Sequence, residues 1–477
     1  MDDFYGRHRE LNILKELLDK RSASLVVIRG RRRIGKSRLA EKFCESFSKS
    51  YTFVGLPPEK NVTAEMERDH FANALEEQTG LQGLRRDDWD FLFYNLSQFT
   101  KTGKILIILD EINWMGKKDP TFLGKLKTAW DVHFKKNPEL IMILSGSVST
   151  WIEKNILSST GYFGRVELDI VLKELPLYDC NHFWRPYEEK ISAYEKFKIL
   201  CATGGVPRYL ESIDPKISAE ENIRRLFYRK EGLFFTEFDR IFSDLFAKKS
   251  PVYKKLVQRL AEGPAELEDI YHALGKAKSG IYSEYLEDLQ KTGYVSRDFT
   301  WGIKEGKYTT VSQFRLSDNY LRFYLKYIDP YKEDILQDRD KIPSQWHTIM
   351  GLQFENLVLN NRKSIYRLLN INPDEIRIDN PYFQHKTSRT PGVQIDYLIQ
   401  TELNNLYFIE IKFKKDKIGS DVIAEVQEKI SRFSFPKGYS IRIVLIHVNG
   451  VTDSLEESKF FSHIIDFGRL LKNPNPG

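Results

Sequence analysis

The segment from Gly30 to Ser37 reads GRRRIGKS and matches the pattern G-x-x-x-x-G-K-S/T at every fixed position. Such a loop surrounds phosphate oxygens with backbone N–H groups, while its lysine meets the β- and γ-phosphates and its hydroxyl binds Mg²⁺. The flanks fit, because residues 24–28 predict a buried strand and residues 38–47 an amphipathic helix. A basic turn that happens to contain glycine is the alternative. We predict ATP contacts from Gly30, Arg31, Arg32, Arg33, Ile34, Gly35, Lys36, Ser37 and Arg38.

Two adjacent acids follow a second apolar run. Residues 104–109 read KILIIL and lead into Asp110 and Glu111. Asp110 would share the Mg²⁺ ion with Ser37, and Glu111 would polarise the water that attacks the γ-phosphate. A turn that carries two surface acids is the alternative. Residues 141–144 predict a further strand that runs into Ser145 and Ser147, whose hydroxyls either sense the γ-phosphate or simply give the strand a polar end.

A third group of charged residues lies near the C-terminus, on two alternating strands over 392–399 and 406–412. If their turn centres on Leu403, Asp396 and Glu410 stand opposite each other on one face, and Lys412 shares that face. Two opposed carboxylates repel unless a cation lies between them. Mg²⁺ would satisfy both acids, with Lys412 orienting or activating a water. An exposed hairpin with mixed charges is the alternative.

The elements that position the first two groups alternate between strand and helix, which predicts a parallel sheet covered on both faces. After residue 250 the pattern changes to three helical segments over 252–260, 267–274 and 279–292. Two short strands, 294–297 and 312–316, then flank a basic loop. This order predicts a winged helix, whose candidate contacts to nucleic-acid phosphates are Lys276, Lys278, Arg297, Lys304 and Lys307.

The third helix of this module also carries Glu284, Glu287 and Asp288, which oppose entry into a DNA groove. A protein-interaction or lid-coupling role is therefore the alternative for the module.

The N-terminal half resembles the archaeal-type ATPase family, which is related to the AAA+ and STAND ATPases. The resemblance covers about residues 1–240. It rests on the loop from Gly30 to Ser37, on LDE at 109–111 and SGS at 145–147, and on FYGR at 4–7, Glu10, Gly164-Arg165 and GVPR at 205–208. It implies that Tyr5, Gly6 and Arg7 lie near adenine and that Pro207 and Arg208 belong to a helical lid, with Arg208 as a sensor. Arg165 stands before a predicted strand over 166–170, where an arginine finger would reach a nucleotide of its own or of a neighbouring chain.

The C-terminal constellation resembles the PD-(D/E)xK nuclease superfamily, with Asp396 followed by Glu410-Ile411-Lys412. That resemblance implies an upstream helix acid, and Glu355 lies among Leu352, Val358 and Leu359 on the helix face that should point inward. Gln427, on the helix after the core strands, is a further candidate. No proline precedes Asp396, and members of the superfamily retain the fold after losing activity. The predicted catalytic residues across the chain are Glu111, Arg165, Glu355, Asp396, Glu410 and Lys412, and the predicted metal ligands are Ser37, Asp110, Asp396 and Glu410.

These observations predict an α/β protein with four domains: a P-loop ATPase domain over 1–175, a helical lid over 176–245, a winged helix over 246–330, and a restriction-endonuclease-like α/β domain over 331–477. A chain of 477 residues with 41% hydrophobic residues can build several cores. Its three cysteines form no metal or disulfide spacing, the start lacks the features of a signal peptide, and no run of about 18 apolar residues occurs. We therefore expect a cytoplasmic protein without membrane insertion. The net charge of +6 is compatible with anionic partners but decides nothing alone.

The predicted function is that of an ATPase whose nucleotide state controls a Mg²⁺-dependent, nuclease-like domain acting on DNA, with RNA as an alternative substrate. A second hypothesis is a STAND-like regulatory or defence switch whose C-terminal domain is catalytically inactive and binds nucleic acid or protein. A third is an ATPase that remodels a protein partner. The sequence leaves the oligomeric state open, including a homo-oligomer in which Arg165 acts in trans.

Overall fold

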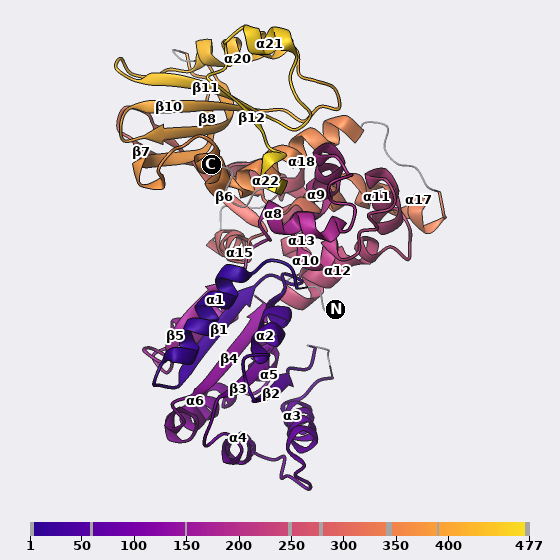
Figure 1. Cartoon of the computed structure of the whole chain (residues 1–477), viewed down its shortest axis with the longest axis vertical. Coiled ribbons are helices and arrows are strands. Elements are labelled where there is room, and N and C mark those ends of the chain that lie inside the picture. Colours follow the sequence, from indigo (N-terminus) through magenta and orange to yellow (C-terminus); the bar gives the residue numbers. More distant parts are fainter. Residues whose placement is uncertain are drawn as a thin grey trace. The chain divides into compact units, whose positions relative to one another are not determined.

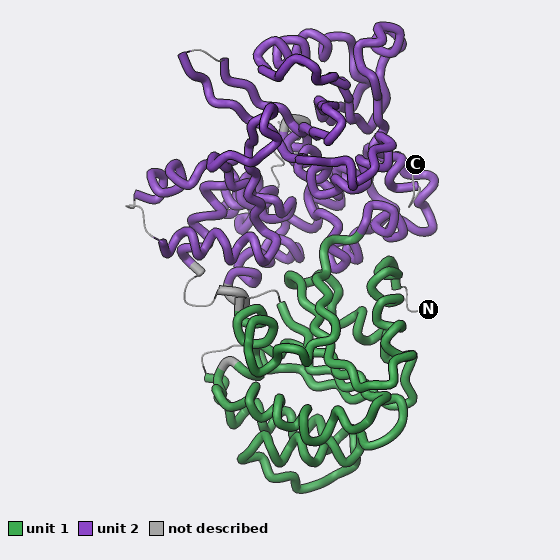
Figure 2. Tube along the Cα trace, turned by 90° about the vertical axis from the view of Figure 1, so that its left-hand side faces the viewer, with its two compact units in different colours: residues 1–175, 243–247 green, residues 176–242, 248–477 purple. Residues whose placement is uncertain are grey.

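The computed structural model describes residues 4–57, 61–147, 150–246, 250–275, 280–339, 346–388 and 391–472. The chain divides into two compact units (Figure 2). The first comprises Met1–Leu175 with Ser243–Ala247, and the second comprises Pro176–Phe242 with Lys248–Gly477. Lys276 and Lys278, two of the predicted phosphate contacts, lie outside the described residues.

The first unit is built on a five-stranded, entirely parallel sheet in the order β2-β3-β4-β1-β5. Its strands are β1 (Ser24–Gly30), β2 (Lys49–Val54), β3 (Ile105–Asp110), β4 (Leu140–Ser147) and β5 (Val166–Val171). Its helices are α1 (His8–Glu16), α2 (Lys36–Cys44), α3 (Ala64–Thr79), α4 (Trp89–Gln98), α5 (Ile112–Lys117), α6 (Phe122–Val132) and the short α7 (Thr150–Ile152). The predicted parallel α/β arrangement is confirmed.

Both faces of this sheet are buried because side chains alternate along each strand. On β1, Val26 and Ile28 pack in one cluster with α1 and α2, while Leu25 and Val27 pack in another with α3, α4 and α6. Figure 1 shows α1 and α2 beside β1, β4 and β5. With both faces covered, the loops that follow the carboxyl ends of the central strands are left to meet at that end of the sheet.

The second unit contains helices and two sheets. Its helices are α8 (Leu177–Asn181), α9 (Ala193–Thr203), α10 (Pro207–Leu210), α11 (Ala219–Phe227), α12 (Leu233–Phe246, whose last residues group with the first unit), α13 (Ser250–Glu262), α14 (Leu267–Ala273), α15 (Gly280–Lys291), α16 (Asn319–Tyr327), α17 (Lys332–Leu336), α18 (Trp346–Asn360), α19 (Arg362–Leu368), α20 (Asp421–Arg432), α21 (Asp453–Glu457) and α22 (Arg469–Lys472). Its strands are β6 (Val295–Gly302), β7 (Lys307–Leu316), β8 (Ile376–Gln384), β9 (Val393–Thr401), β10 (Asn405–Ile411), β11 (Ser440–His447) and β12 (His463–Asp466).

The larger sheet has the order β12-β11-β10-β9-β8, in which β8, β9 and β10 are antiparallel and β10, β11 and β12 are parallel. Helix α20 covers it through Val422 and Val426, which are fully buried with Ile395 and Phe408 of the strands. The predicted hairpin over β9 and β10 is confirmed.

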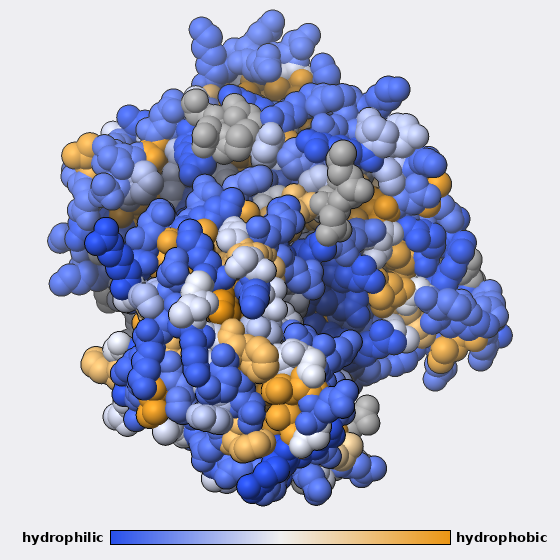
Figure 3. All heavy atoms as spheres, turned by 60° about the horizontal axis from the view of Figure 1, so that its bottom comes forward, coloured by the Kyte–Doolittle hydropathy of each residue, from blue (hydrophilic) through white to orange (hydrophobic). Residues whose placement is uncertain are grey.

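Figure 3 shows one face of the whole molecule. On that face, hydrophobic side chains lie in groups among more numerous hydrophilic ones.

The hairpin of β6 and β7 extends further than the sequence predicts and belongs to the same core as the larger sheet. Trp301 and Ile303 of β6 are buried in the cluster that contains Tyr382 and Ile395, and the Trp301 indole N–H donates to Gln400 Oε1 at 2.7 Å. The predicted loop over 298–311 is therefore mostly strand. Local sequence could not show this, because packing against a distant sheet is what holds these residues extended.

Candidate functional site

The phosphate-loop segment leaves β1 and enters α2, as the motif requires. Gly35 adopts φ 93°, a left-handed conformation that favours glycine, and it is the residue before the first turn of α2. A Cβ on Gly30 would lie 2.8 Å from the carbonyl oxygen of Leu172, so a side chain does not fit there. The backbone geometry thus explains why both fixed positions of the pattern are glycine. The N-terminus of α2 follows the loop directly.

Lys36 is buried and folds back over its own loop. Its ammonium donates to the carbonyl oxygens of Gly30 at 3.1 Å and Arg31 at 3.4 Å. Burial lowers the pKa of Lys36, and the nearby acids Glu111 and Asp110 act in the opposite direction. A phosphate group entering the loop would supply the anionic partner that this buried cation needs.

Ser37 and Asp110 meet where the loop passes the end of β3. The Ser37 hydroxyl donates to Asp110 Oδ2 at 2.6 Å, and the Ser145 hydroxyl donates to Asp110 Oδ1. This junction forms because β4, which carries Ser145, lies between β1 and β3 in the sheet. Hydroxyl and carboxylate oxygens are hard ligands of the kind that Mg²⁺ takes together with water, so the residues present fit that ion.

Glu111 occupies a strained position directly after β3. Its φ of 51° is left-handed, which is uncommon for a residue other than glycine. Burial raises the pKa of Glu111, with a further contribution from Asp110. Its Oε2 atom is buried without a hydrogen-bond partner in the described part of the chain, and the same holds for Oδ1 of Asn113. Two unsatisfied acceptors at one strand end are suited to holding a water molecule.

The residues near the chain start bind the loop rather than pointing away from it. The Arg7 guanidinium donates to the carbonyl oxygens of Ile34 at 2.9 Å and Lys173 at 2.5 Å, and only 5% of the residue is exposed. Gly6 and Arg7 both have positive φ, so the chain turns sharply here. The predicted adenine contacts of Tyr5, Gly6 and Arg7 stay a prediction.

Two arginines in and beside the loop make ion pairs. Arg31 pairs with Glu174, and Arg38, in the first turn of α2, pairs with Glu41 at 3.6 Å. Arg33 adopts a left-handed φ of 66°. The charge of Arg32 adds to the larger effect of burial in lowering the pKa of Lys36. The predicted ATP contacts of these four arginines stay a prediction.

Arg165 is placed differently from what the sequence suggests. It precedes β5, whose first residue pairs with Leu25 at the start of β1, whereas the phosphate loop follows the end of β1. Six residues of parallel strand correspond to about 20 Å. Its guanidinium makes a two-pronged hydrogen bond with Asp131 of α6, at 3.0 and 2.9 Å. The prediction that Arg165 reaches a nucleotide bound to its own chain is therefore wrong, and only the action in trans stays a prediction.

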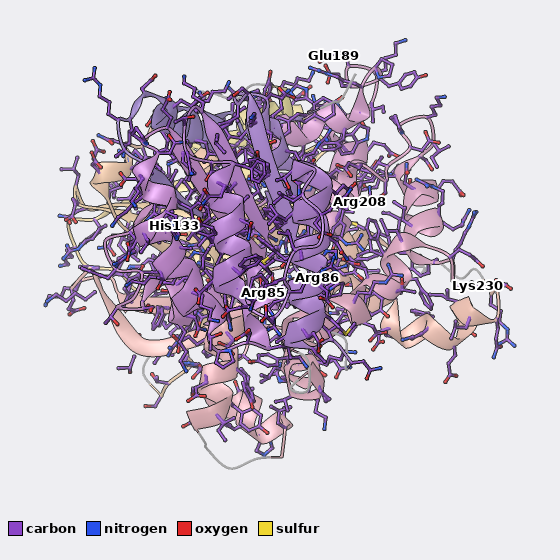
Figure 4. The ribbon with its side chains drawn as sticks, turned by 90° about the horizontal axis from the view of Figure 1, so that it is seen from below. Arg85, Arg86, His133, Glu189, Arg208 and Lys230 are labelled. Carbon is purple, nitrogen blue, oxygen red and sulfur yellow. The ribbon has the colours of Figure 1, made fainter. Side chains whose placement is uncertain are left out.

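Pro207 and Arg208 lie in the second unit, where Pro207 begins the short helix α10. The Arg208 guanidinium donates to Glu211 at 2.9 Å and is largely exposed (Figure 4). Their predicted nucleotide contacts stay a prediction.

The register of β9 and β10 agrees with the one predicted from a turn centred on Leu403. The pairing of Ile409 with Tyr397 continues toward Glu410 and Asp396. Oδ2 of Asp396 accepts from the backbone N–H of Ile411 at 2.9 Å, which fixes the carboxylate beside β10. Glu410 is 1% exposed, and its Oε1 lies 3.0 Å from the Lys412 ammonium. The three predicted residues are therefore together.

Lys429 of α20 is a member of this site that the sequence did not indicate. Its ammonium lies 2.6 Å from Glu410 Oε2 and 3.2 Å from Asp396 Oδ1. Lys412, in turn, also pairs with Glu425 of α20 at 2.5 Å. The spacing of Glu425 and Lys429, one helical turn apart, is the only signal that would have found them.

The charge of Asp396 also acts on Glu355 of α18. Burial and then the charge of Asp396 raise the pKa of Glu355 to about 7, although Arg322 and Arg315 oppose this shift. Burial also raises the pKa of Glu410, again with a contribution from Asp396. Asp396 and Glu410 thus share the Lys429 ammonium, and the predicted role of Glu355 as the upstream acid stays a prediction.

Two details of that prediction are wrong. Leu352, expected beside Glu355 on the inward face, is 36% exposed, whereas Gln353 and Asn356 are buried, so the buried face of α18 does not include Leu352. Gln427 is exposed, and Lys429, two residues later on α20, is the residue that reaches the acids.

The residues of this site fit a divalent cation. The Lys429 ammonium stands in for one, since two carboxylates already share it. Among the described residues, no group of three or more histidine, cysteine or acidic side chains is placed to hold a metal ion. Mg²⁺ commonly binds through one or two carboxylates and completes its shell with water and substrate oxygens, which is what Asp396 and Glu410 would provide.

An open groove of about 630 Å³ leads to Lys429. It is lined by α20, by the ends of β8 and β9 and by Gln313 of β7. His385, Lys386 and Arg432 contribute basic groups, and Glu425 and Glu428 contribute acidic ones.

The β6–β7 hairpin is not available as a free wing. Its Arg297 packs over the rings of Phe299 and Phe314 and donates to Ser312 Oγ at 2.9 Å. Arg297 is nevertheless exposed, as are Lys304 and Lys307, and the predicted phosphate contacts of all three stay a prediction. We find no membrane-spanning helix in the described parts of the chain, because each one is too short or too polar.

The parallel sheet and the glycine loop between β1 and α2 define the first unit as an α/β domain of the P-loop ATPase type. In agreement, residues 4–213 match the model of a family described as an ATPase domain predominantly from Archaea.

Individual proteins are similar to the chain as well. An uncharacterized protein of Methanocaldococcus jannaschii is 26% identical over 362 residues, which cover 74% of this chain and 76% of that protein. The Walker-type ATPase of Pyrococcus abyssi has a similar structure, with a TM-score of 0.51, 16% identity, and coverage of 68% of this chain and 97% of the other. The ORC2 protein of Aeropyrum pernix gives a TM-score of 0.41 at 14% identity and covers 71% and 96% of the two chains.

Proposed function

We propose that the protein is an ATP-hydrolysing P-loop ATPase that controls a Mg²⁺-dependent nuclease-like domain acting on DNA. The observation that supports the ATPase half is the junction of Ser37 and Asp110 beside the buried Lys36. With ATP bound, Mg²⁺ would be held by Ser37 and Asp110 and would neutralise developing phosphate charge. Glu111 would orient the attacking water through its buried carboxylate oxygen.

Two variants separate nucleotide binding from hydrolysis. Lys36→Ala removes the phosphate-binding cation, so ATP binding and turnover should both fall. Glu111→Gln retains the size of the side chain but lacks the base, so ATP should bind and turnover should be lost. Titration with a fluorescent ATP analogue and a phosphate-release assay measure the two quantities. Equal turnover in the wild type and Lys36→Ala would refute the assignment of the loop.

The nuclease half is supported by the convergence of Asp396, Glu410 and Lys412. Lys429, which contacts both acids, lines the open groove. Two opposed carboxylates would hold the cation, and Lys412 would orient a water or stabilise charge on the phosphate. The basic groups lining the groove would meet the backbone of a nucleic acid.

The test incubates DNA and RNA of defined sequence with Mg²⁺ or Mn²⁺, with and without ATP. Wild type should cleave, and Asp396→Asn should not. Gln427→Ala is the matched control, since Gln427 lies on the covering helix but is exposed. Cleavage that persists in Asp396→Asn would come from a contaminant, and no cleavage under any condition would contradict the nuclease half.

Control of one site by the other is supported by a buried polar network within the second unit. Asn319 of α16 and Gln353 of α18 both donate to the carbonyl oxygen of Cys201 in α9, each at 2.9 Å. Glu355 lies two residues after Gln353 on α18, and the charge of Asp396 acts on it. A shift of α9, in the segment predicted as the lid, would therefore be passed to the acidic site through α18. We take α13–α15 with β6 and β7 as a winged-helix-like module that is joined to the C-terminal core and serves this coupling.

A STAND-like switch with an inactive C-terminal domain is the second candidate. The position of the Lys429 ammonium favours it, because the two acids are already neutralised without a metal. In that case DNA would bind without being cut, and only the nucleotide state would change its affinity.

A further inference from the structure

Lys429 engages the two carboxylate oxygens that a divalent cation would need. Of the four oxygens on Asp396 and Glu410, one accepts the Ile411 N–H and one faces Lys412. The two that remain, Asp396 Oδ1 and Glu410 Oε2, both contact the Lys429 ammonium. A metal ion that bridges the two acids must therefore displace this ammonium.

The competition is unequal between the two lysines. Of the two site acids, Lys412 contacts only Glu410, and it also pairs with Glu425 of α20. Displacing Lys412 would expose one carboxylate, whereas displacing Lys429 would release both. The Lys429 side chain is 30% exposed and borders the open groove, so it has space to leave. Glu425, one turn earlier on α20, is an acid within reach of the displaced ammonium.

We propose that Lys429 is a positioning residue that acts as an internal counter-cation: it holds Asp396 and Glu410 together in the metal-free protein and sets the affinity of the site for divalent cations by competing with them. The proposal rests on the proposed function only in taking these acids as a metal site. A protein with such a competitor stays stable and inactive until the local metal concentration, or a substrate phosphate that attracts the lysine, tips the exchange.

The test measures Mn²⁺ binding to the nucleotide-free, full-length chain by calorimetry and by electron paramagnetic resonance. Lys429→Met should bind Mn²⁺ at least about tenfold more tightly than wild type, which corresponds to ~1.4 kcal/mol. Lys429→Arg retains the charge and should stay near the wild-type affinity. Asp396→Asn should lose this binding, alone and combined with Lys429→Met, and it also measures any binding elsewhere in the chain.

Arg432→Met is the matched control. Arg432 lies on the same helix and borders the same groove, but it pairs with Glu428. Equal Mn²⁺ affinity in wild type and Lys429→Met would overturn the proposal, as would an equal gain in Arg432→Met.

A second readout is thermal stability. Without metal, Lys429→Met should unfold at a lower temperature than wild type, because its two acids face each other unpaired. Addition of Mn²⁺ should raise the unfolding temperature of Lys429→Met and so remove the difference. If Lys429→Met fails to fold even with Mn²⁺, the cation does not replace the ammonium and the proposal is wrong. Mn²⁺ binding that depends on Asp396 without cleavage of any DNA would contradict the nuclease function and leave the role of Lys429 intact.

Discussion

The hydroxyl of Ser37 lies 2.6 Å from a carboxylate oxygen of Asp110, 73 residues further along the chain. The contact joins the loop after β1 to the end of β3, with β4 between them. In Ser37→Ala the Mg²⁺ ligand is lost, so ATP turnover should fall by about two orders of magnitude, or ~2.7 kcal/mol in the barrier. Ser37→Thr keeps the hydroxyl and should retain most of the turnover. A phosphate-release assay at saturating ATP checks both variants, and similar losses in both would argue against the hydroxyl as ligand.

Arg7 should support the nucleotide site through the backbone of the loop. Arg7→Met removes two hydrogen bonds to the carbonyl oxygens of Ile34 and Lys173, which should destabilise the first unit by about 1–3 kcal/mol. ATP affinity should fall about tenfold as the loop loosens. Arg9→Met is the control, because Arg9 lies two residues after Arg7 and is exposed. Chemical denaturation and ATP titration measure the two effects. Unchanged stability and ATP affinity in Arg7→Met would contradict a supporting role of Arg7.

Arg165 should not contribute to hydrolysis within a single chain, because it lies at the opposite end of the parallel strands from the phosphate loop. At protein concentrations where the chain is monomeric, Arg165→Ala should turn over ATP within about twofold of wild type. If wild-type turnover rises with protein concentration and the variant's does not, Arg165 acts in trans. Sedimentation and turnover measured on the same dilution series decide this. A loss of turnover in the monomer would be incompatible with the observed topology.

Glu67 should make the first unit less stable as the pH rises. The residue is 2% exposed, and burial raises its pKa to about 7, while the hydrogen bond from the Leu56 backbone N–H opposes the shift. Between the ordinary value near 4.5 and about 7 the folded state holds a proton that the unfolded state has released, so stability falls with pH over that interval. Above it the loss is complete, about 3 kcal/mol at ~1.4 kcal/mol for each pH unit of that interval.

Glu67→Gln accepts the same hydrogen bond without a charge, so its stability should be flatter between pH 5 and about 8 and should exceed that of wild type at the upper end. Thermal unfolding of both proteins across this range is the measurement. Parallel curves would mean that Glu67 titrates normally.

Trp301 of the β6–β7 hairpin is part of the C-terminal core. Trp301→Ala should destabilise the second unit by about 3–5 kcal/mol, because a buried ring and its hydrogen bond to Gln400 are lost. Tyr308→Ala removes a ring from the partner strand that is 53% exposed, and it should change stability by less than about 0.5 kcal/mol. Denaturant unfolding monitored by circular dichroism distinguishes them, and equal effects would mean that the hairpin is not anchored in this core.

The sequence by itself determined the features that depend on local pattern. Gly30, Gly35, Lys36 and Ser37 could be recognised because the motif restricts residue type through backbone geometry, and the strands before Asp110 and Ser145 because buried parallel strands are continuously apolar. The opposition of Asp396 and Glu410 could be predicted too, since a hairpin's register follows from the centre of its turn.

Only the tertiary structure decided which residues meet across elements. Nothing in the sequence places Lys429 between two acids on separate strands, or Trp301 in a core formed some 80 residues later, because such contacts depend on how a helix or hairpin packs on a sheet. The position of Arg165 likewise follows from parallel pairing with β1, which sets it a full strand length from the loop it was expected to reach. Spacing along the chain limits what neighbours in sequence can do, whereas the order of strands in the sheet decides which distant side chains share a site.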